Sequence, residues 1–499
     1  MPYATLSHSW GHTQSLRLIQ NNLEILQIGI NIETLPRTFQ HAVCVARKLG
    51  LRYLWIDSLC ILQDSADDWR KESAMMRHVY SNGSLNIAAT AASGDQDGLS
   101  FQRNPHSSRH ITVNITWKHP DLVSHKPPGR YYIFNGGIWD REVESAPLNK
   151  RGWVLQERSL SPRILHFGRT QLYWQCNTAL RSEMFPRDLR TKNLGPHVPR
   201  VTSRFTTRLR ALQQQQRGQP AAAEHELAGA HAHWSELVNA YSATRLSRPA
   251  DKLIAVQALA ETMQDATGDA YVAGLWRSRL AEDVLWRTDV DERRPLRRPA
   301  RWRAPTWSWA SLDAQVESRG AYHYVGRRAG QAAPFFVREM VPSVEGFGGV
   351  ETGQLRSARL GVRGLLYRSG EPIAMRVMDE PLSLSRPARA EAPWSLKVFL
   401  DEWDEQVVHA AEHTMPAGSL FFPVGSPIAG TVEGLVLEPV AERDGEFQRI
   451  AFFEIDVLEP GGADSLLKGL QILEDAENLG HLKDGEDSEG RTVYQFTLI

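Results

Sequence analysis

The stretch from Tyr53 to Asp64 constrains the fold of this chain more than any other. It opens with Tyr53–Ile56, an apolar segment rich in aromatic and β-branched residues, which is typical of a buried strand. Polar residues follow where that strand ends, namely Asp57, Ser58, Cys60 and Gln63. Ligands of open α/β sheets bind at the carboxyl ends of the strands. The stretch therefore predicts a central strand with part of a binding site at its end.

Strands and helices alternate on both sides of this stretch. The expected elements are a strand over Tyr3–Ser7, a helix opened by Leu35–Pro36 and stopped by Gly50, the strand over Leu51–Ile56, a helix carrying Trp69, Met76 and Tyr80, and a strand over Leu85–Ala89. Asp67 and Asp68 precede Trp69 and are expected to cap the second helix. This alternation predicts right-handed βαβ units and hence an α/β fold with a mostly parallel sheet flanked by helices.

The following segments complete a first domain near residue 190. Residues 94 to 150 are rich in Gly, Pro, His and Asn, which indicates a long connection with one strand at Tyr131–Phe134. A helix is expected to begin near Gly152, and Ile164–Phe167 with Leu172–Trp174 predict a hairpin.

The remainder of the chain changes character twice. Gln213–Gln216 and Ala221–Ala223 are low-complexity segments typical of a linker or a frayed helix, and residues 230 to 290 have a helical pattern. Strands are expected at Trp307–Trp309 and, in the tail, at Leu360–Tyr367, Leu396–Leu400, Leu420–Val424, Gly434–Val440, Ile450–Ile455 and Val493–Leu498, with a charged segment from Glu474 to Glu489. The predicted domains are 1–190, a helical middle region 191–313 and a β-rich domain 314–499.

Composition excludes several classes of protein. The chain has 499 residues, 42% of them hydrophobic and 23% charged, as in an ordinary globular protein of two or three domains. The formal net charge of −1 gives no overall attraction to nucleic acid or to an anionic membrane. Three cysteines cannot form a disulfide framework, and the sequence shows neither a secretory signal nor an apolar run that spans a bilayer. We therefore expect a soluble cytoplasmic protein.

Three ordered blocks and several shorter matches resemble one known family. The blocks are Tyr3–Gly11, Tyr53–Asp64 continued by Asp68, Trp69, Glu72, Met76 and Tyr80, and Arg151–Arg158. The shorter matches are Leu35–Thr38, Tyr241–Ser242, Asp251–Leu253, Ala273–Trp276 and Trp307–Ser311. Together they resemble the fungal heterokaryon incompatibility (HET) domain over residues 3 to about 313. The resemblance implies a TIR-like fold and a role in fungal self/non-self recognition and regulated cell death.

The resemblance also implies a catalytic residue. Some TIR proteins cleave NAD with one glutamate, which lies in a helix after the third strand with an aromatic side chain nearby. Glu157 takes that position here, and Trp153 lies four residues earlier on the same helical face. A carboxylate stabilises the oxocarbenium-like state that forms when the nicotinamide–ribose bond breaks. The alternative is that Glu157 only forms a salt bridge with Arg151, Arg158 or Arg163.

Six residues are expected to bind NAD as substrate, and no cofactor or metal is implied. They are Ser7, Trp10, Asp57, Ser58, Gln63 and Trp153. Strand ends that are neighbours would place Ser7, Asp57 and Glu157 in one cleft. The alternatives are that Asp57 caps the following turn and that Trp10 belongs to the core. His8 stands where many family members carry tyrosine, and His41 where many carry aspartate, so the cleft differs from the family pattern.

Other motifs favour structural roles. Cys60 is expected to be a buried structural cysteine, and Gly346–Gly349 a turn. His225, His231 and His233 lack the spacing of a zinc site and are interpreted as solvated. The arginines between Arg293 and Arg303, together with their prolines and acidic neighbours, indicate a solvated loop rather than a nucleic-acid contact.

Two hypotheses of different classes follow. In the first, the protein cleaves NAD through Glu157 and needs self-association or a partner protein for activation, because a constantly active enzyme would kill its host. In the second, it is a non-enzymatic signalling module that acts by protein–protein interaction, with recognition supplied by the β-rich tail. The surroundings of Glu157 discriminate between them.

Overall fold

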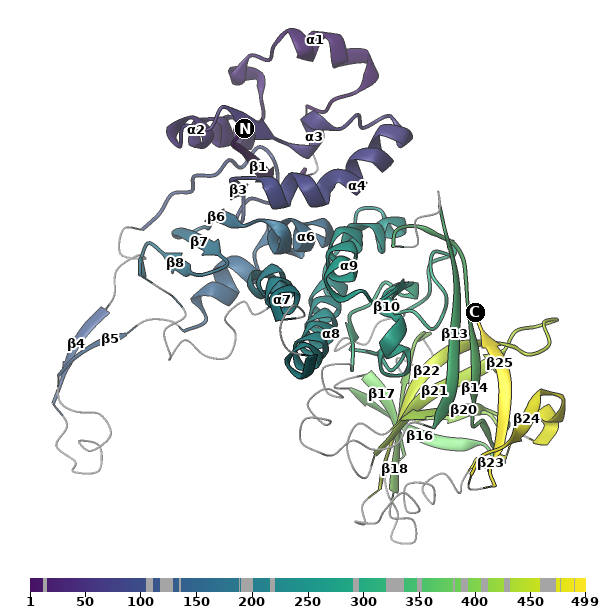
Figure 1. Cartoon of the computed structure of the whole chain (residues 1–499). Coiled ribbons are helices and arrows are strands. Elements are labelled where there is room, and N and C mark those ends of the chain that lie inside the picture. Colours follow the sequence, from purple (N-terminus) through teal and green to yellow (C-terminus); the bar gives the residue numbers. More distant parts are fainter. Residues whose placement is uncertain are drawn as a thin grey trace. The chain divides into compact units, whose positions relative to one another are not determined.

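The computed structural model divides the chain into two compact units, Met1–Thr207 and Arg208–Ile499 (Figure 1). It describes residues 1–499 except 12–15, 105–110, 117–128, 134–135, 188, 190–200, 216–219, 290–295, 320–335, 348–351, 380–381, 387–393, 405–411, 426–430, 458–472, 476 and 489. The predicted boundaries at 190 and 313 stay predictions, and each unit is described by itself. None of the described helices is long and apolar enough to cross a membrane.

A six-stranded sheet forms the centre of the N-terminal unit, in the order β2-β1-β3-β6-β7-β8. Its strands are β1 (Tyr3–Ser7), β2 (Tyr53–Trp55), β3 (Leu85–Ala88), β6 (Arg163–Phe167), β7 (Leu172–Cys176) and β8 (Leu180–Ser182). The pairs among β2, β1, β3 and β6 are parallel, whereas β6 with β7 and β7 with β8 are antiparallel. The predicted hairpin is therefore confirmed, and the α/β sheet is mixed.

The strand predicted as central and buried lies at the edge of the sheet. β2 pairs with β1 alone among the described strands, and Tyr53 is 48% exposed. The strands β1 and β3 are the buried ones, with Leu6 and Ile87 in the core. Leu54 packs against that core, whereas Trp55 stacks edge-on against Tyr80. The apolar residues of β2 therefore pack on both faces of the sheet although the strand lies at its edge. Apolar residues on both faces are also the pattern of a central strand, so the sequence alone did not distinguish the two positions.

Helices cover both faces of this sheet. On one face, α2 (Arg37–Lys48) buries Phe39, Ala42 and Ala46 against Ala4, Leu6 and Ile87. The opposite face carries Thr5, Ser7, Asn86 and Ala88, since side chains alternate along a strand. There α6 (Gly152–Leu160) packs Val154 against Ala88 and contacts α4 (Ala66–Asn82). The helix predicted to begin near Gly152 is confirmed.

The cap of α4 differs from the prediction. Ser65 is the N-cap, and its side chain accepts a hydrogen bond from the Asp68 backbone N–H at 3.2 Å. Asp67 and Asp68 lie within the first turn, where their charges favour the helix dipole. A serine two residues before the acidic pair was therefore the true start signal.

The long connection between β3 and α6 holds more structure than predicted. A hairpin of β4 (Ile111–Ile115) and β5 (Gly129–Ile133) extends from it (Figure 1), and β4 was not predicted. Phe134, the last residue of the predicted strand, lies outside the described residues. A π-helical turn (Asp140–Glu144) and a 3-10 turn (Pro147–Lys150) then lead into α6.

The C-terminal unit opens with helices and short strands. They are α7 (Val201–Gln215, which contains the boundary between the units), α8 (Pro220–Ser242), α9 (Ile254–Thr267), α10 (Leu280–Asp283), β9 (Tyr271–Val272), β10 (Leu275–Trp276), β11 (Arg287–Thr288) and β12 (Val316–Glu317). The described residues of the low-complexity segments are helical. Gln213–Gln215 belong to α7, and Ala221–Ala223 belong to α8. Gln216 lies outside the described residues.

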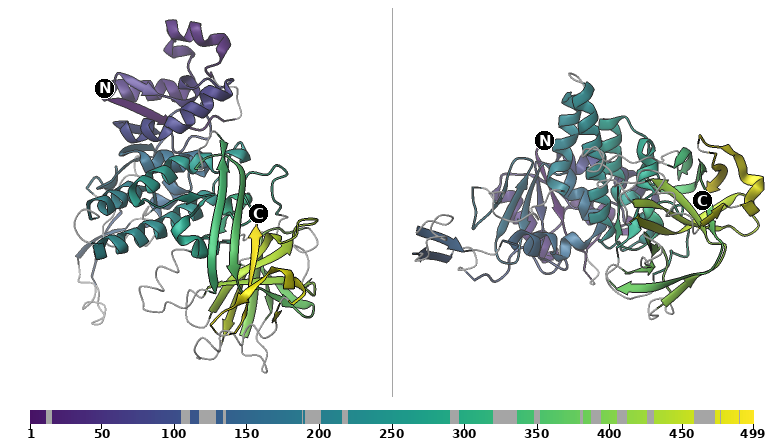
Figure 2. Two further views of the ribbon diagram at one scale, coloured as in Figure 1. Left: turned by 45° about the vertical axis from the view of Figure 1, so that its right-hand side comes forward. Right: turned by 90° about the horizontal axis from the view of Figure 1, so that it is seen from below.

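A large, mainly antiparallel sheet forms the rest of this unit (Figure 2). Its strands are β13 (Val337–Gly346), β14 (Leu355–Gly364), β15 (Tyr367–Ser369), β16 (Ile373–Asp379), β17 (Leu382–Arg386), β18 (Trp394–Leu400), β19 (Glu412–Met415), β20 (Leu420–Gly425), β21 (Thr431–Pro439), β22 (Glu446–Val457), β23 (Leu473–Asp475), β24 (Lys483–Glu486) and β25 (Thr492–Leu498). All six predicted strands of the β-rich tail are confirmed. The charged segment after Glu474 contains β24, and Glu489 lies outside the described residues.

The arginine-rich loop is not the solvated segment that was predicted. Arg298 donates to Asp401 at 2.7 Å and to Ser311 at 2.6 Å, and Arg303 is 9% exposed and pairs with Asp313 at 2.6 Å. Arg293 and Arg294 lie outside the described residues. Arg298 and Arg303 thus join this loop to the folded unit, whereas Arg297 and Arg301 are exposed as predicted.

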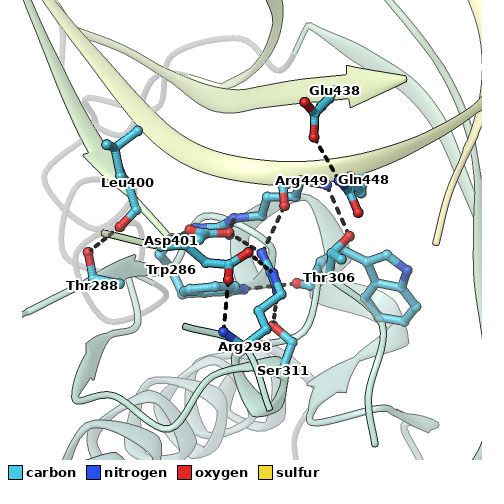
Figure 3. Close-up of polar contacts among 12 residues, drawn as sticks. Trp286, Thr288, Arg298, Thr306, Ser311, Leu400, Asp401, Glu438, Gln448 and Arg449 are labelled. Atoms are coloured by element: carbon cyan, nitrogen blue, oxygen red, sulfur yellow. Dashed lines mark hydrogen bonds and ion pairs between the residues drawn. The ribbon is translucent and has the colours of Figure 1, made fainter. Parts of the chain in front are cut away.

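Arg449 occupies the centre of the same network (Figure 3). It is fully buried, donates to Asp401 and to the Val284 and Trp286 carbonyls, and lies 3.3 Å from the centroid of the Trp286 ring. Nearby, Trp307 and Trp309 are buried as predicted. They do not form a strand, because Trp309 begins a 3-10 turn (Trp309–Ser311) and Trp307 lies two residues before it.

We expect Asp401→Asn to lower the free energy of unfolding of this unit by about 3–5 kcal/mol, because it leaves the Arg449 charge buried without its counter-ion. Urea denaturation followed by tryptophan fluorescence measures this, since Trp286 and Trp403 lie in the same unit. The control is Glu438→Gln, an exposed carboxylate bonded to Gln448, for which a change within about 0.5 kcal/mol is expected. Equal effects of the two substitutions would contradict this account.

Candidate functional site

Glu157 and Ser7 meet at the carboxyl end of β1. Ser7 is the last residue of that strand, and its hydroxyl donates to Glu157 Oε2. Ser7 also bonds to Asn86 of β3, whose amide nitrogen lies 3.0 Å from the Ser7 oxygen. Glu157 is 6% exposed and Ser7 1%. A carboxyl group is therefore held almost out of water at the edge of the sheet where ligands of α/β folds bind.

Burial raises the pKa of Glu157 from 4.5 to about 7. The hydrogen bonds from Ser7 and Tyr80 and the positive charge of Arg151 oppose this increase, while the charge of Asp57 adds to it. Tyr80 comes from α4 and is 2% exposed. At neutral pH this carboxyl group thus exists in both its charged and its neutral form, which is the range in which a group accepts or donates a proton efficiently.

Asp57 is the second centre of the site. The two centres and their neighbours form the cluster, which contains Glu157, Asp57, Ser7, His8, Trp10, Tyr80, Asn86 and Arg151. Asp57 begins α3 (Asp57–Cys60), and its carboxylate accepts from the Ser58 backbone N–H at 2.7 Å and from Trp10 Nε1 at 3.1 Å. The His8 ring nitrogen lies 3.6 Å from the same carboxylate, and burial lowers the pKa of His8. Asp57 is therefore the first residue of its helical turn but not its N-cap, which is Ile56, and its carboxylate holds the segment that follows Ser7.

Arg151 joins this segment to α6. It is the N-cap residue of that helix, and its guanidinium donates to the His8 backbone carbonyl. Its charge lowers the pKa of Glu157, yet the described residues include no arginine in an ion pair with Glu157. Arg158 instead pairs with Glu144 at 2.9 Å, and Arg163 donates to the Ser84 carbonyl. The salt bridge offered as the alternative for Glu157 is thus not formed.

A close glycine contact positions the chain just after Trp10. Gly11 has a φ of +74°, and a Cβ atom there would lie 3.0 Å from the Cα of Gly94. Only glycine adopts this backbone conformation without strain and leaves room for the neighbouring chain. The glycine that ends the first sequence block therefore fixes the direction of the chain beside Asp57.

The remaining predicted residues lie around the cluster in different ways. Trp10 is half-buried and not a core residue, and Trp153 stacks edge-on against Trp69 with ring centroids 6.1 Å apart. Ser58 and Gln63 bond through their backbone groups to Leu18, at 2.8 and 2.9 Å. The Gln63 side chain donates to the Asp57 carbonyl at 3.1 Å. Their roles toward a ligand stay predictions.

Three residues of the cluster were not predicted as functional. Tyr80 was predicted only as part of a sequence block, Arg151 only as a structural salt-bridge partner of Glu157, and Asn86 only as part of a strand. Asn86 could have been identified from strand alternation, because it lies beside Thr5 in the register and so shares the face of Ser7.

Two interpretations of isolated residues are wrong. Cys60 is exposed rather than buried, because it ends the short helix that follows the edge strand. His231 and His233 are buried rather than solvated, and the side chain of His225 lies outside the description. Burial and the charge of Arg279 lower the pKa of His231 to about 4. The described residues contain no group of three or more His, Cys, Asp or Glu that would hold a metal ion.

Comparison with known proteins identifies the N-terminal part. Residues 3–157 match the family model described as heterokaryon incompatibility protein (HET). This part of the chain is a HET domain. The match ends at Glu157 and so spans the three sequence blocks and both centres of the cluster. The comparisons with curated proteins and with solved structures gave no match.

We expect the Glu157 carboxyl group to titrate near pH 7. A raised pKa favours the neutral native form, so its contribution to stability is complete below pH 4.5 and is lost as the pH rises to about 7. The difference in unfolding free energy between the wild type and Glu157→Gln should therefore fall by on the order of 3 kcal/mol over that interval. Infrared difference spectra of the two proteins should show a protonated carboxyl band that disappears through about pH 7.

The exposed Glu33 provides the control, since Glu33→Gln should show no such difference. Identical pH dependence in Glu157→Gln and the wild type would show that Glu157 titrates normally.

Proposed function

We propose that this heterokaryon incompatibility-type protein acts in fungal self/non-self recognition and regulated cell death by cleaving NAD, with Glu157 as the catalytic carboxylate. The observation that carries the proposal is the placement of a nearly buried carboxyl group, with a pKa of about 7, at the strand end where a ligand would bind. A TIR-like origin of the fold and a cytoplasmic location belong to the same proposal.

The chemistry uses the charged form of Glu157. As the nicotinamide–ribose bond breaks, positive charge develops on the ribose, and a carboxylate in a dry site stabilises it more strongly than one in water. Ser7, Asn86 and Tyr80 hold the carboxyl group in one orientation. In this proposal Trp10, whose indole donates to Asp57, contacts the substrate ring, and Asp57 contacts the ribose hydroxyls. Water then attacks the ribose carbon, which yields ADP-ribose and nicotinamide.

The shielding of Glu157 and Ser7 from solvent is consistent with an enzyme that is inactive until it is regulated. Glu157 and Ser7 are hydrogen-bonded to each other and have little access to solvent. A substrate would need the segment around His8 and Trp10 to move away from Asp57. Self-association or binding of a partner protein would supply the energy for that movement, so that the isolated protein stays inactive.

We expect purified full-length protein to release nicotinamide from NAD at concentrations that drive self-association. Glu157→Gln should reduce the rate at least about a hundredfold, because an amide cannot supply the negative charge at the transition state. The rate should rise with pH through about 7, as Glu157 ionises. High-performance liquid chromatography of nicotinamide measures both effects, and circular dichroism confirms that the variant is folded.

Glu33→Gln is the matched control, since this exposed carboxylate lies outside the cluster and its loss should leave the rate unchanged. Release that survives Glu157→Gln would remove Glu157 from the centre of the reaction.

The same shielding also favours a second candidate function. A carboxyl group locked between α6 and β1 can serve as a switch that alters the surface of a non-enzymatic signalling module. Absence of nicotinamide release at all protein concentrations, with a Glu157→Gln variant that nevertheless changes partner binding, would favour this module over the enzyme.

A further inference from the structure

The C-terminal unit contains a pocket of its own. It has a volume of about 300 Å³ and is lined by residues from the end of α8, the following loop and the segment after Trp309, among them Tyr241, Arg245, Pro249, Lys252 and Asp313. The pocket is small for a ligand site, so it would hold a small molecule rather than a dinucleotide.

Lys252 is a buried residue that contributes to the lining of this pocket. The residue is 5% exposed, and its Nζ donates to the Leu312 carbonyl. Its nearest carboxylate oxygen, Asp313 Oδ1, is 3.9 Å away, and the centroid of the Trp309 ring is 5.9 Å away. An ammonium group offers three donors, and the hydrogen bond to Leu312 uses one of them. The buried charge is thus only partly compensated.

Asp313 supplies only part of the missing compensation. Its carboxylate pairs with Arg303 at 2.6 Å, much closer than with Lys252. Arg303 is itself held by the Ala310 carbonyl at 2.6 Å and the Pro249 carbonyl at 3.0 Å. The single carboxylate of Asp313 is therefore shared between two cations, and it lies closer to Arg303 than to Lys252.

Arg245 adds a second positive charge at the mouth of the pocket. It is exposed, and its guanidinium forms no ion pair or hydrogen bond within the described part of the chain. The hydroxyl groups of the lining are already engaged, since Tyr241 donates to the Lys252 carbonyl at 2.7 Å and Thr244 to the Tyr241 carbonyl at 2.6 Å. The free donors of the pocket are therefore cationic.

We propose that this pocket binds a small oxyanion, of the phosphate or carboxylate type, between Lys252 and Arg245. An oxyanion accepts charge-assisted hydrogen bonds from both side chains, and a guanidinium binds such groups through two parallel donors. Its negative charge would balance the second of the two cations, Arg303 and Lys252, that share the Asp313 carboxylate. The proposal is independent of NAD cleavage.

The ionisation of Lys252 gives a distinctive readout. Burial and the charge of Arg303 lower the pKa of Lys252 to about 7, whereas Asp313 raises it. The groups that face the ammonium are thus Arg303, Asp313 and the Trp309 ring. A bound anion favours the charged form, so binding at about pH 8 should take up a proton. A structural lysine without a ligand would give no such uptake.

The test is isothermal titration calorimetry of the full-length protein with inorganic phosphate and, separately, malonate, at constant ionic strength and in two buffers of different ionisation enthalpy. We expect binding of at least one anion with proton uptake, weakened at least about tenfold by Lys252→Met and by Arg245→Gln, as the loss of one charged hydrogen bond implies. The two anions distinguish a phosphate site from a carboxylate site. Arg248→Gln is the control, since Arg248 is exposed three residues from Arg245 and is not part of the pocket lining.

Three results would overturn the proposal. They are the absence of binding by both anions up to about 10 mM, binding that Arg245→Gln and Lys252→Met leave unchanged, and a loss in Arg248→Gln equal to that in Arg245→Gln. Arg245→Gln keeps the test decisive if Lys252→Met fails to fold, because Arg245 is exposed.

Discussion

Charged side chains that are withdrawn from water need partners, and within each unit this requirement joins segments that are far apart in the sequence. Arg449 shows it most fully. Asp401 supplies the counter-charge, two backbone carbonyls accept its remaining donors, and the Trp286 ring covers its face. Burial still lowers the pKa of this arginine to about 10. The sheet and the loops that precede it cannot separate without leaving one of these charges unpaired, so the network fixes the C-terminal unit as one body.

Glu157 and Lys252 differ from Arg449 in how far their charge is compensated. Glu157 has hydroxyl and amide neighbours but no ion pair in the described part of the chain, and Lys252 has one carbonyl and a carboxylate already bound to Arg303. Each has a pKa near 7 because burial outweighs its partners. A buried group left this way costs stability, which a protein tolerates where the group has chemistry or a ligand to serve. A buried charge that its neighbours compensate fully thus indicates a structural role. A buried charge that they compensate only in part indicates a candidate site.

Local patterns revealed the elements of the fold, while pairing over long sequence distances stayed hidden. The helix over Arg37–Lys48 and the strand over Leu85–Ala88 follow from apolar periodicity within one segment. Whether Tyr53–Trp55 lies at the edge or the centre depends on which strands pair with β1, and no periodicity encodes that. Similarly, the arginine-rich loop looked solvated because the partner of Arg298, Asp401, lies over a hundred residues away. At the site, Ser7 and Asp57 were predicted beside Glu157, whereas Asn86 and Tyr80 join it only through tertiary packing.

The sequence blocks that resemble the HET family gather at two places in the structure. The three long blocks meet at Glu157, Ser7 and Asp57 within the matched residues. The shorter blocks of the C-terminal unit, which exclude Leu35–Thr38, meet around Trp309. The Trp309 indole donates to the Gly274 carbonyl at 2.9 Å, and its ring faces Tyr241 and Lys252. A Cβ atom at Gly274 would lie 2.7 Å from that indole nitrogen, so this glycine is required for the contact. The second cluster lies outside the residues of the HET match and carries its own partly compensated charge. The proposed anion site would therefore make the C-terminal unit a second functional part rather than an inert extension of the HET domain.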